Sequence, residues 1–192
     1  MARINTTGGA VDDSDLGLTL IHEHMWVRSE AVSFQFPHLY DEEREYERAI
    51  TQVSAAMERG VKTICDPTVM EAGRDIRFMS RIAEETGIQL VASTGIYAYH
   101  YVAPHSRTAT RTTWRTSSSA GRGYADRMML SQDACCTIDW FPEELVAQMA
   151  PNWHMSYVLD EIVPALKEAG VTDEQVDQMM VEAPRRWLAA GG

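Results

Sequence analysis

Two histidines at alternate positions stand at the end of an apolar run and could bind a metal ion. The run LGLTLIHEHM extends from Leu16 to Met25 and ends in His22, Glu23 and His24. In an extended strand, residues i and i+2 point to the same side, so both imidazoles face one way while Glu23 turns away. Such a pair is half of a metal site, although the pattern also fits two hydrogen-bonded histidines.

A carboxylate far along the chain is the third candidate ligand. Asp133 lies in the stretch RMMLSQDACC, which we interpret as another strand with the acid toward its C-terminal end. With the two histidines it would form an open zinc-type site that leaves one position for water. An aspartate at a strand end can instead cap a loop or pair with a base, and the pattern leaves both interpretations open.

Alternating strands and helices would position these side chains. Hydrophobic periodicity and capping residues predict further strands over 61–68 and 88–99 and helices over 41–60, 73–87, 155–170 and 172–190. Such alternation favours a parallel sheet covered by helices, with the chemistry at the C-terminal ends of the strands.

The composition narrows the class of partner. The chain has 192 residues and 45% hydrophobic content, which is enough for one compact domain. A net charge of -11 argues against binding to nucleic acid or to an anionic membrane, so a small molecule is the expected partner. No apolar run approaches the roughly 20 residues of a membrane span, and the N-terminus does not resemble a secretory signal. We therefore predict a cytoplasmic protein whose three cysteines are reduced.

Several blocks of the sequence resemble the phosphotriesterase family, most closely its phosphotriesterase-like lactonases. The blocks include GLTLIHEH, GVKTICDPTVMEAGRDIRFM, TGIYAY and LSQDACCTIDW, and they occur in the family's order. The resemblance implies an α/β fold, a TIM (β/α)8 barrel of the amidohydrolase-like type. It also implies a hydrolase of lactones or organophosphate esters that holds two divalent metal ions, with zinc as the favoured metal.

The resemblance assigns roles to individual residues. His22 and His24 match the paired histidines that bind the more buried metal. Asp133 matches a ligand of the same metal that also accepts the proton of the attacking water, which makes it the catalytic residue. Candidate substrate-binding residues follow from the same blocks, although the aromatic ones could simply pack at a barrel rim and the cysteine could be a small buried residue: Tyr97, Cys135, Trp140 and Trp153.

Parts of the family's metal site have no counterpart in this sequence. The family's bridging lysine and its two further metal histidines lie on the fourth, fifth and sixth strands. The only lysines here are Lys62, which enters the second strand, and Lys167, in a C-terminal helix. We therefore expect a partial barrel that retains strands 1–3 and 8, lacks the middle strands, and holds one metal ion or none.

An acid-free run separates the two matching parts. SRTATRTTWRTSSSAGR, from Ser106 to Arg122, is rich in Ser, Thr and Arg, and a one-base shift of suitable codons converts it into an acidic amphipathic peptide. We interpret it as a frameshift scar at an internal deletion. The expected division is 1–105, with strands 1–3, the scar at 106–123, and 124–192, with strand 8 and the terminal helices, all within one domain. A flexible loop of a naturally small protein is the alternative.

Two functions remain open. The first is a zinc-dependent hydrolase whose substrate is a lactone or an organophosphate ester. The second is a non-catalytic, truncated remnant of a damaged gene that binds at most one metal ion. Because an opened barrel exposes strand edges and apolar side chains, we also expect self-association, for example as a homodimer.

Overall fold

The computed structural model describes residues 2–94, 123 and 125–190 of the chain. Tyr97 and almost all of the predicted scar therefore lie outside the described residues. Within the described part, the strands are β1 (Arg3–Thr6), β2 (Gly9–Asp12), β3 (Leu18–Leu20), β4 (Val61–Asp66) and β5 (Gln89–Ala92).

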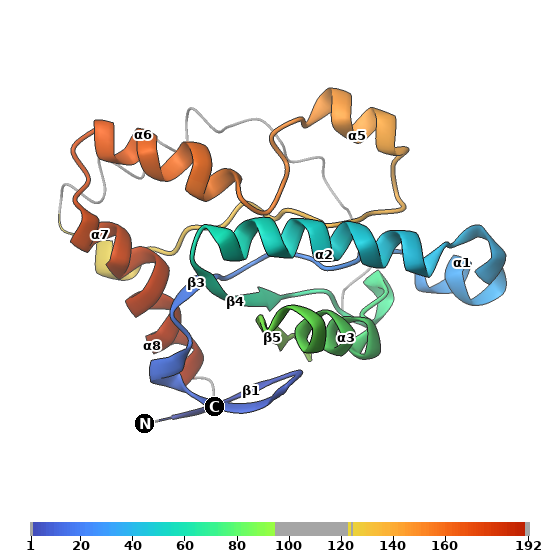
Figure 1. Ribbon diagram of the computed structural model, residues 1–192, viewed down its shortest axis with the longest axis horizontal. Helices are drawn as coiled ribbons and strands as arrows, with labels where there is room; N and C mark the ends of the chain where they lie inside the picture. The colour runs from blue at the N-terminus through green and yellow to red at the C-terminus, as the bar shows by residue number, and fades with distance from the viewer. Residues whose placement is uncertain (1, 95–122, 124, 191–192) are drawn as a thin grey trace.

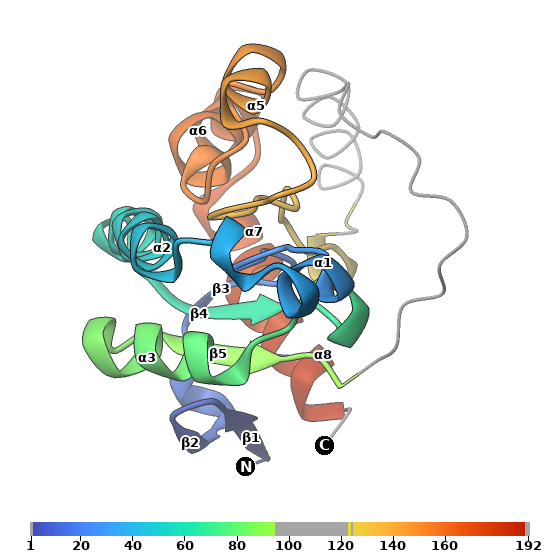
Figure 2. The ribbon, with the colours of Figure 1, turned by 90° about the vertical axis from the view of Figure 1, so that its right-hand side faces the viewer.

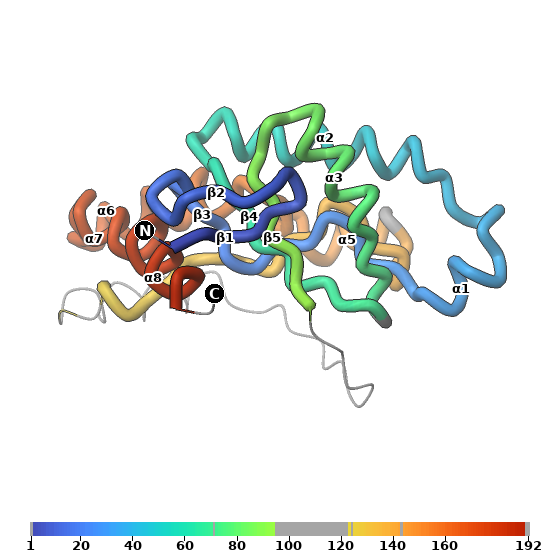
Figure 3. The backbone as a smooth tube through the Cα atoms, turned by 90° about the horizontal axis from the view of Figure 1, so that it is seen from below, coloured from blue at the N-terminus to red at the C-terminus, as the bar shows by residue number. Residues whose placement is uncertain are grey.

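A small parallel sheet organises the fold. Its strand order is β3-β4-β5, with Ile64 opposite Leu20 on one side and Leu90 on the other. Strands β1 and β2 form a separate antiparallel hairpin, which packs against β5 (Figure 3). Apart from Lys62, the residues of β4 are buried, as expected for a central parallel strand covered on both faces. The predicted α/β class is therefore confirmed.

Helices and short turns connect and cover the strands. The α-helices are α1 (Glu30–Gln35), α2 (Glu42–Glu58), α3 (Ile76–Thr86), α5 (Glu143–Met149), α6 (Val163–Glu168), α7 (Asp173–Asp177) and α8 (Ala183–Ala190). Short 3-10 turns span Asp13–Asp15, Pro37–Leu39, Met70–Ala72 and Ala125–Arg127. Figures 1 and 2 show α2 and α3 side by side along the sheet, and α8 packs against the β1 hairpin.

The two longest helices form within the ranges predicted from the sequence, 41–60 and 73–87. The carboxylate of Asp41 accepts a hydrogen bond from the amide of Arg44 at the start of α2. Asp75 caps α3 in the same way, and Gly87 ends that helix with a φ of 80°. A side-chain cap accepts hydrogen bonds from amides that have no partner within the helix. At the other end, glycine adopts the left-handed backbone conformation that commonly terminates a helix.

The C-terminal helices each contain a π-helical turn just before a proline. These turns span Val158–Ile162 and Gln178–Glu182, and Pro164 and Pro184 follow them. Proline has no amide hydrogen and its ring clashes with the carbonyl four residues earlier, so the wider turn relieves the conflict. The sequence predicts the helices but not this local widening.

The hydrophobic core lies between the sheet and the helices α2 and α3. Leu20, Ile64 and Leu90 contribute from the strands, while Val53 and Phe78 contribute from the helices, and all five side chains are almost fully buried. Full burial of a side chain of this size stabilises the folded state by about 1.5–3 kcal/mol. The core therefore fixes the end of β3, which His22 and His24 follow in the chain.

The segment predicted as a further strand over 127–136 is only partly correct. Parallel bridges join His24 to Cys135 and Val27 to Ile138, so the chain does run beside the continuation of β3. The residues before Cys135 form no regular strand, because Asp133 adopts a left-handed φ of 62°. No helix among the described residues is long and apolar enough to cross a membrane.

Candidate metal centre

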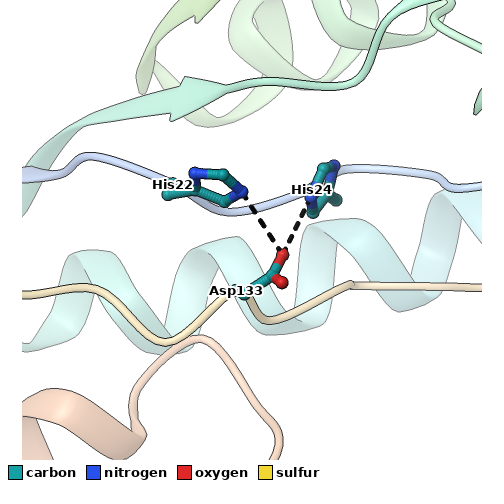
Figure 4. A group of neighbouring side chains, drawn as sticks. All are labelled: His22, His24 and Asp133. Atoms are coloured by element: carbon teal, nitrogen blue, oxygen red, sulfur yellow. Dashed lines mark ion pairs between the residues drawn. The ribbon is translucent and has the colours of Figure 1, made fainter. Parts of the chain in front are cut away.

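His22, His24 and Asp133 converge at the C-terminal end of β3 (Figure 4). The Nε2 atom of His24 lies 2.9 Å from Oδ1 of Asp133, and the Nε2 atom of His22 lies 3.5 Å from the same oxygen. One ligand atom from each residue lies within 4.8 Å of the others. The two imidazoles and the carboxylate thus face a common point.

This arrangement fits a tetrahedral zinc ion. Zinc binds histidine nitrogen and carboxylate oxygen at about 2.0–2.2 Å, so two ligand atoms on one tetrahedral ion lie about 3.3 Å apart. The two nitrogen–oxygen distances bracket that value, and small side-chain rotations would equalise them. The donor set also leaves the open fourth position that is typical of catalytic zinc sites.

Backbone pairing across the sheet holds the histidine segment in place. The amide of Glu23 donates to the carbonyl of Cys65 on β4, and the amide of His24 donates to the carbonyl of Ala134 on the other side. The histidines are thereby fixed between two neighbouring segments. Although β3 ends at Leu20, both imidazoles face one side as expected, since their rings lie 5.5 Å apart and both Nε2 atoms approach Asp133.

A second layer of contacts orients His24. Its Nδ1 atom lies 2.7 Å from Oγ1 of Thr68, which leaves Nε2 to face Asp133. The buried carboxylate of Asp66 accepts hydrogen bonds from the amides of Met25 and Thr68, at 2.9 and 2.7 Å. Such outer partners fix the orientation of a metal-binding imidazole.

The two histidines differ in their exposure to solvent. The side chain of His22 is 52% exposed, whereas that of His24 is 16% exposed. Desolvation lowers the pKa of His22, although the nearby charge of Asp133 acts in the opposite direction. The neutral imidazole that a metal requires is therefore the dominant form of His22 at neutral pH.

Glu23 is the functional candidate that reasoning from the sequence missed. Its side chain is fully buried, and burial raises its pKa to about 7. It accepts hydrogen bonds from the Ser131 hydroxyl at 2.6 Å, from the Gln132 amide at 3.1 Å and from the Ala134 amide. An acid within an apolar run was the available signal, because buried carboxylates require partners.

The candidate substrate residues lie at different places. The indole nitrogen of Trp153 donates to the carbonyl of Asp133, which puts this ring beside the ligand set. Cys135 is buried and bridged to His24, and burial raises the pKa of its thiol. Trp140 is 38% exposed, and no hydrogen bond or ring contact within the described residues joins it to the ligand set. Tyr97 lies outside the described residues.

Neither lysine takes part in the candidate centre. Lys62 projects from β4 against Gly17, while Lys167 pairs with Asp173 near the start of α7. Within the described ranges, His22, His24 and Asp133 form the one group of three side chains that could hold a metal ion. The described residues therefore offer ligands for a single ion.

Comparison of the sequence with known proteins identifies a family. The sequence model described as the phosphotriesterase family matches residues 2–119 and 115–188. An aryldialkylphosphatase of Saccharolobus solfataricus is 27% identical and aligns over 94% of this chain and 97% of its own length. A phosphotriesterase homology protein of Mycobacterium tuberculosis is 26% identical, over 97% of each chain.

Solved structures show the same fold. The structure of the phosphotriesterase from Mycobacterium tuberculosis superposes with a TM-score of 0.87 at 24% identity and covers 97% of this chain and 98% of its own. A mutant organophosphorus hydrolase from Deinococcus radiodurans gives a TM-score of 0.78 at 18% identity, over 98% of this chain and 97% of its own.

The alignments also reveal a difference in length. The alignment with the aryldialkylphosphatase runs over 305 positions, whereas this chain has 192 residues. Since the match reaches both ends of the relative, many of its residues have no counterpart here.

Proposed function

Because this chain belongs to the phosphotriesterase family, a family of metal-dependent hydrolases, we propose that it binds one divalent metal ion and hydrolyses lactones or organophosphate esters. Zinc is the proposed metal, and His22, His24 and Asp133 are its proposed ligands. The convergence of these three side chains on one point is the observation that carries the proposal.

The chemistry follows from the donor set. A zinc ion, when bound, supplies Lewis acidity and lowers the pKa of a water ligand to about 7. Asp133 accepts the proton of the attacking water, and its side chain is 67% exposed, so it can pass that proton to solvent. Thr68 keeps Nε2 of His24 directed at the centre throughout.

The substrate would lie over the exposed side of the centre. Trp153, whose ring is hydrogen-bonded beside Asp133, is proposed to contact the substrate, together with Tyr97, Cys135 and Trp140. Among these four, Trp153 has the strongest structural support. A small neutral ester or lactone also suits a chain with a net charge of -11.

The fold is proposed to be part of the family's barrel. We assign β3, β4 and β5 to strands 1–3 and the segment around Cys135 to strand 8, with an internal deletion at 106–123. Two observations support this: the parallel bridge between His24 and Cys135, and the 305-position alignment of a 192-residue chain. In a closed barrel the eighth strand pairs with the first, and the bridge between His24 and Cys135 is consistent with that assignment.

A non-catalytic remnant is the second candidate function. It is favoured by the single group of three ligands within the described ranges, because the family mechanism stated above uses two metal ions. Lys62 lies against Gly17 and Lys167 pairs with Asp173, and neither contact involves the three candidate ligands. Neither lysine is therefore a candidate for a metal bridge.

Metal content per chain is the deciding experiment. Protein purified with zinc or cobalt is analysed for metal, and lactone and organophosphate hydrolysis are measured before and after chelation. One metal ion and a hydrolysis that Asp133→Asn abolishes would support the hydrolase. One metal ion or none, without hydrolysis, would support the remnant, and two ions would require ligands beyond the three named.

Self-association is proposed as a consequence of the shortened fold. Phe34 and Leu39, on and after α1, are 86% and 65% exposed, and Phe141 before α5 is 49% exposed. Both helices lie at the periphery of the molecule in Figure 1. A homodimer that covers such side chains should elute at twice the monomer mass in size-exclusion chromatography with light scattering.

A further inference from the structure

Glu23 connects the two parts of the chain that supply the metal ligands. It stands between His22 and His24, and its carboxylate receives the hydroxyl of Ser131 and the amides of Gln132 and Ala134. The contact between Glu23 and Ala134 joins residues 111 positions apart. One side chain therefore links the histidine segment to both residues that flank Asp133.

These contacts replace the ordinary pairing of a strand. In a regular ladder, the amides of Gln132 and Ala134 would donate to the carbonyls of a neighbouring strand. Here they donate to a carboxylate, and between them Asp133 takes its left-handed conformation with a φ of 62°. The carboxylate of Glu23, which accepts from both flanking amides, thus stabilises the turn of the backbone at Asp133.

The orientation of Asp133 is the functional result of this arrangement. Its carboxylate reaches back to the histidines, with Oδ1 at 2.9 Å from Nε2 of His24. The side chain of Asp133 is 67% exposed, whereas Glu23 is fully buried. Hydrogen bonds therefore hold the backbone around this exposed ligand: the amides on either side of Asp133 donate to Glu23, and the Trp153 indole donates to the Asp133 carbonyl.

We propose that Glu23 is a positioning residue that holds the backbone around Asp133 so that its carboxylate meets His22 and His24 at one metal ion. The inference rests on the proposed function, since it concerns the same metal centre. Glu23 touches neither metal nor substrate in this role. It acts through the amides of Gln132 and Ala134 and through the hydroxyl of Ser131.

The shape of glutamate explains why this residue type is needed. Two carboxylate oxygens accept from three donors, with Oε1 shared by Ser131 and Gln132 and Oε2 directed at Ala134. Glutamine has one accepting oxygen, so it can accept from the Gln132 side or from the Ala134 side of Asp133 but not from both. Aspartate is one methylene shorter and would leave the donors unpaired.

The test compares two buried acids in the same protein. Glu23→Gln removes one acceptor from the backbone around Asp133. Glu45→Gln is the matched control, because Glu45 is also buried and also contacts the C-terminal segment, through the Thr137 hydroxyl. Zinc affinity is measured by isothermal titration, and the cobalt protein is compared by its visible absorption spectrum. The amides of Gln132 and Ala134 are followed by hydrogen exchange without metal.

We expect Glu23→Gln to weaken zinc binding by about 10- to 100-fold, the range typical of outer-shell partners, and to alter the cobalt spectrum. It should also accelerate exchange at Gln132 and Ala134. Glu45→Gln should change neither zinc affinity nor the cobalt spectrum, even if it lowers stability. Ser131→Ala removes one donor to Glu23 and also the acceptor of the His22 amide, and it should weaken zinc binding in the same direction.

The outcomes separate this inference from the proposed function. Unchanged zinc affinity in both Glu23→Gln and Ser131→Ala would overturn the role of Glu23 while the metal site stands. An equal loss in Glu45→Gln would also overturn it, because general destabilisation would then suffice. If the unaltered protein binds no zinc, the proposed function fails, and the role of Glu23 is then tested by hydrogen exchange alone. Unchanged exchange at Gln132 and Ala134 in Glu23→Gln would show that Glu23 does not order this backbone.

Discussion

The imidazole of His24 is held between Thr68 and Asp133, with Nδ1 at 2.7 Å from the Thr68 hydroxyl and Nε2 at 2.9 Å from the Asp133 carboxylate. Thr68 follows β4, whereas Asp133 comes from the C-terminal part of the chain. The ring plane is thus fixed from two sides, by a neutral partner and a charged one. This relationship makes Thr68 a direct test of the candidate centre.

Thr68→Val replaces the hydroxyl by a methyl group of similar size. Without its partner, the His24 ring can rotate, so we expect zinc affinity to fall by about 10-fold, at the low end for outer partners. Thr63→Val is the control, because Thr63 on β4 is also buried and donates to the carbonyl of Leu16, which is not one of the ligands. Isothermal titration with zinc checks both variants, and equal affinities would contradict the role of Thr68.

Zinc should stabilise the folded chain. Because a ligand that binds only the folded state raises the free energy of unfolding, zinc at 100 times its dissociation constant should add about 2.7 kcal/mol. A chelator should remove this gain completely, and His22→Ala should prevent it. His38→Ala, in a turn outside the ligand group, should keep it. Denaturant unfolding with and without zinc provides the measurement.

The backbone at Asp133 predicts an unusual order of stabilities. A left-handed conformation costs an ordinary residue about 1–2 kcal/mol, while glycine adopts it freely and asparagine tolerates it. Asp133→Asn and Asp133→Gly should therefore unfold at similar denaturant concentrations, with Asp133→Ala less stable by about 1 kcal/mol. If alanine proved as stable as glycine there, the backbone of the free protein would not be left-handed.

Local signals in the sequence predicted much of this structure. The sequence predicts the amphipathic helices capped by Asp41 and Asp75, and it predicts the paired histidines. These features depend only on residues a few positions apart, so a local sequence pattern is enough to reveal them. The turn at Asp133 could not be predicted, because its cause is the carboxylate of Glu23, 109 positions from Gln132. For the same reason, the predicted strand over 127–136 is only partly correct. Likewise, the role of Thr68 depends on a ring 44 positions away.

Helix α7 begins with a capping box, in which the Thr172 hydroxyl accepts from the Gln175 amide and the Gln175 side chain accepts from the Thr172 amide. Thr172→Ala removes the hydroxyl that accepts from the Gln175 amide, so stability should fall by about 1 kcal/mol. Thr51→Ala is the control, since Thr51 lies on an exposed face within α2 and alanine favours helix there. Equal unfolding midpoints for the unaltered protein and Thr172→Ala would mean that the box contributes nothing.

The ion pair between Arg59 and Asp160 should make stability depend on pH. Hydrogen bonding to the Arg59 side chain lowers the pKa of Asp160 in the folded state. The stabilisation is therefore fully present above the ordinary aspartate pKa of about 3.9 and is lost as pH falls through the lower folded value. Asp160→Asn should be less stable than the unaltered protein at pH 6, and the difference should vanish in acid. A difference that persisted at pH 2 would point to another cause.

The distance along the chain between Glu23 and Ala134, 111 positions, bears on how the molecule folds. Contacts between such remote segments form late, because closing a long loop costs entropy before the contact repays it. The ligand set is divided in the same way between the two ends. Metal affinity would therefore arise only once the N-terminal and C-terminal parts have joined, and cobalt absorbance during refolding would time that event.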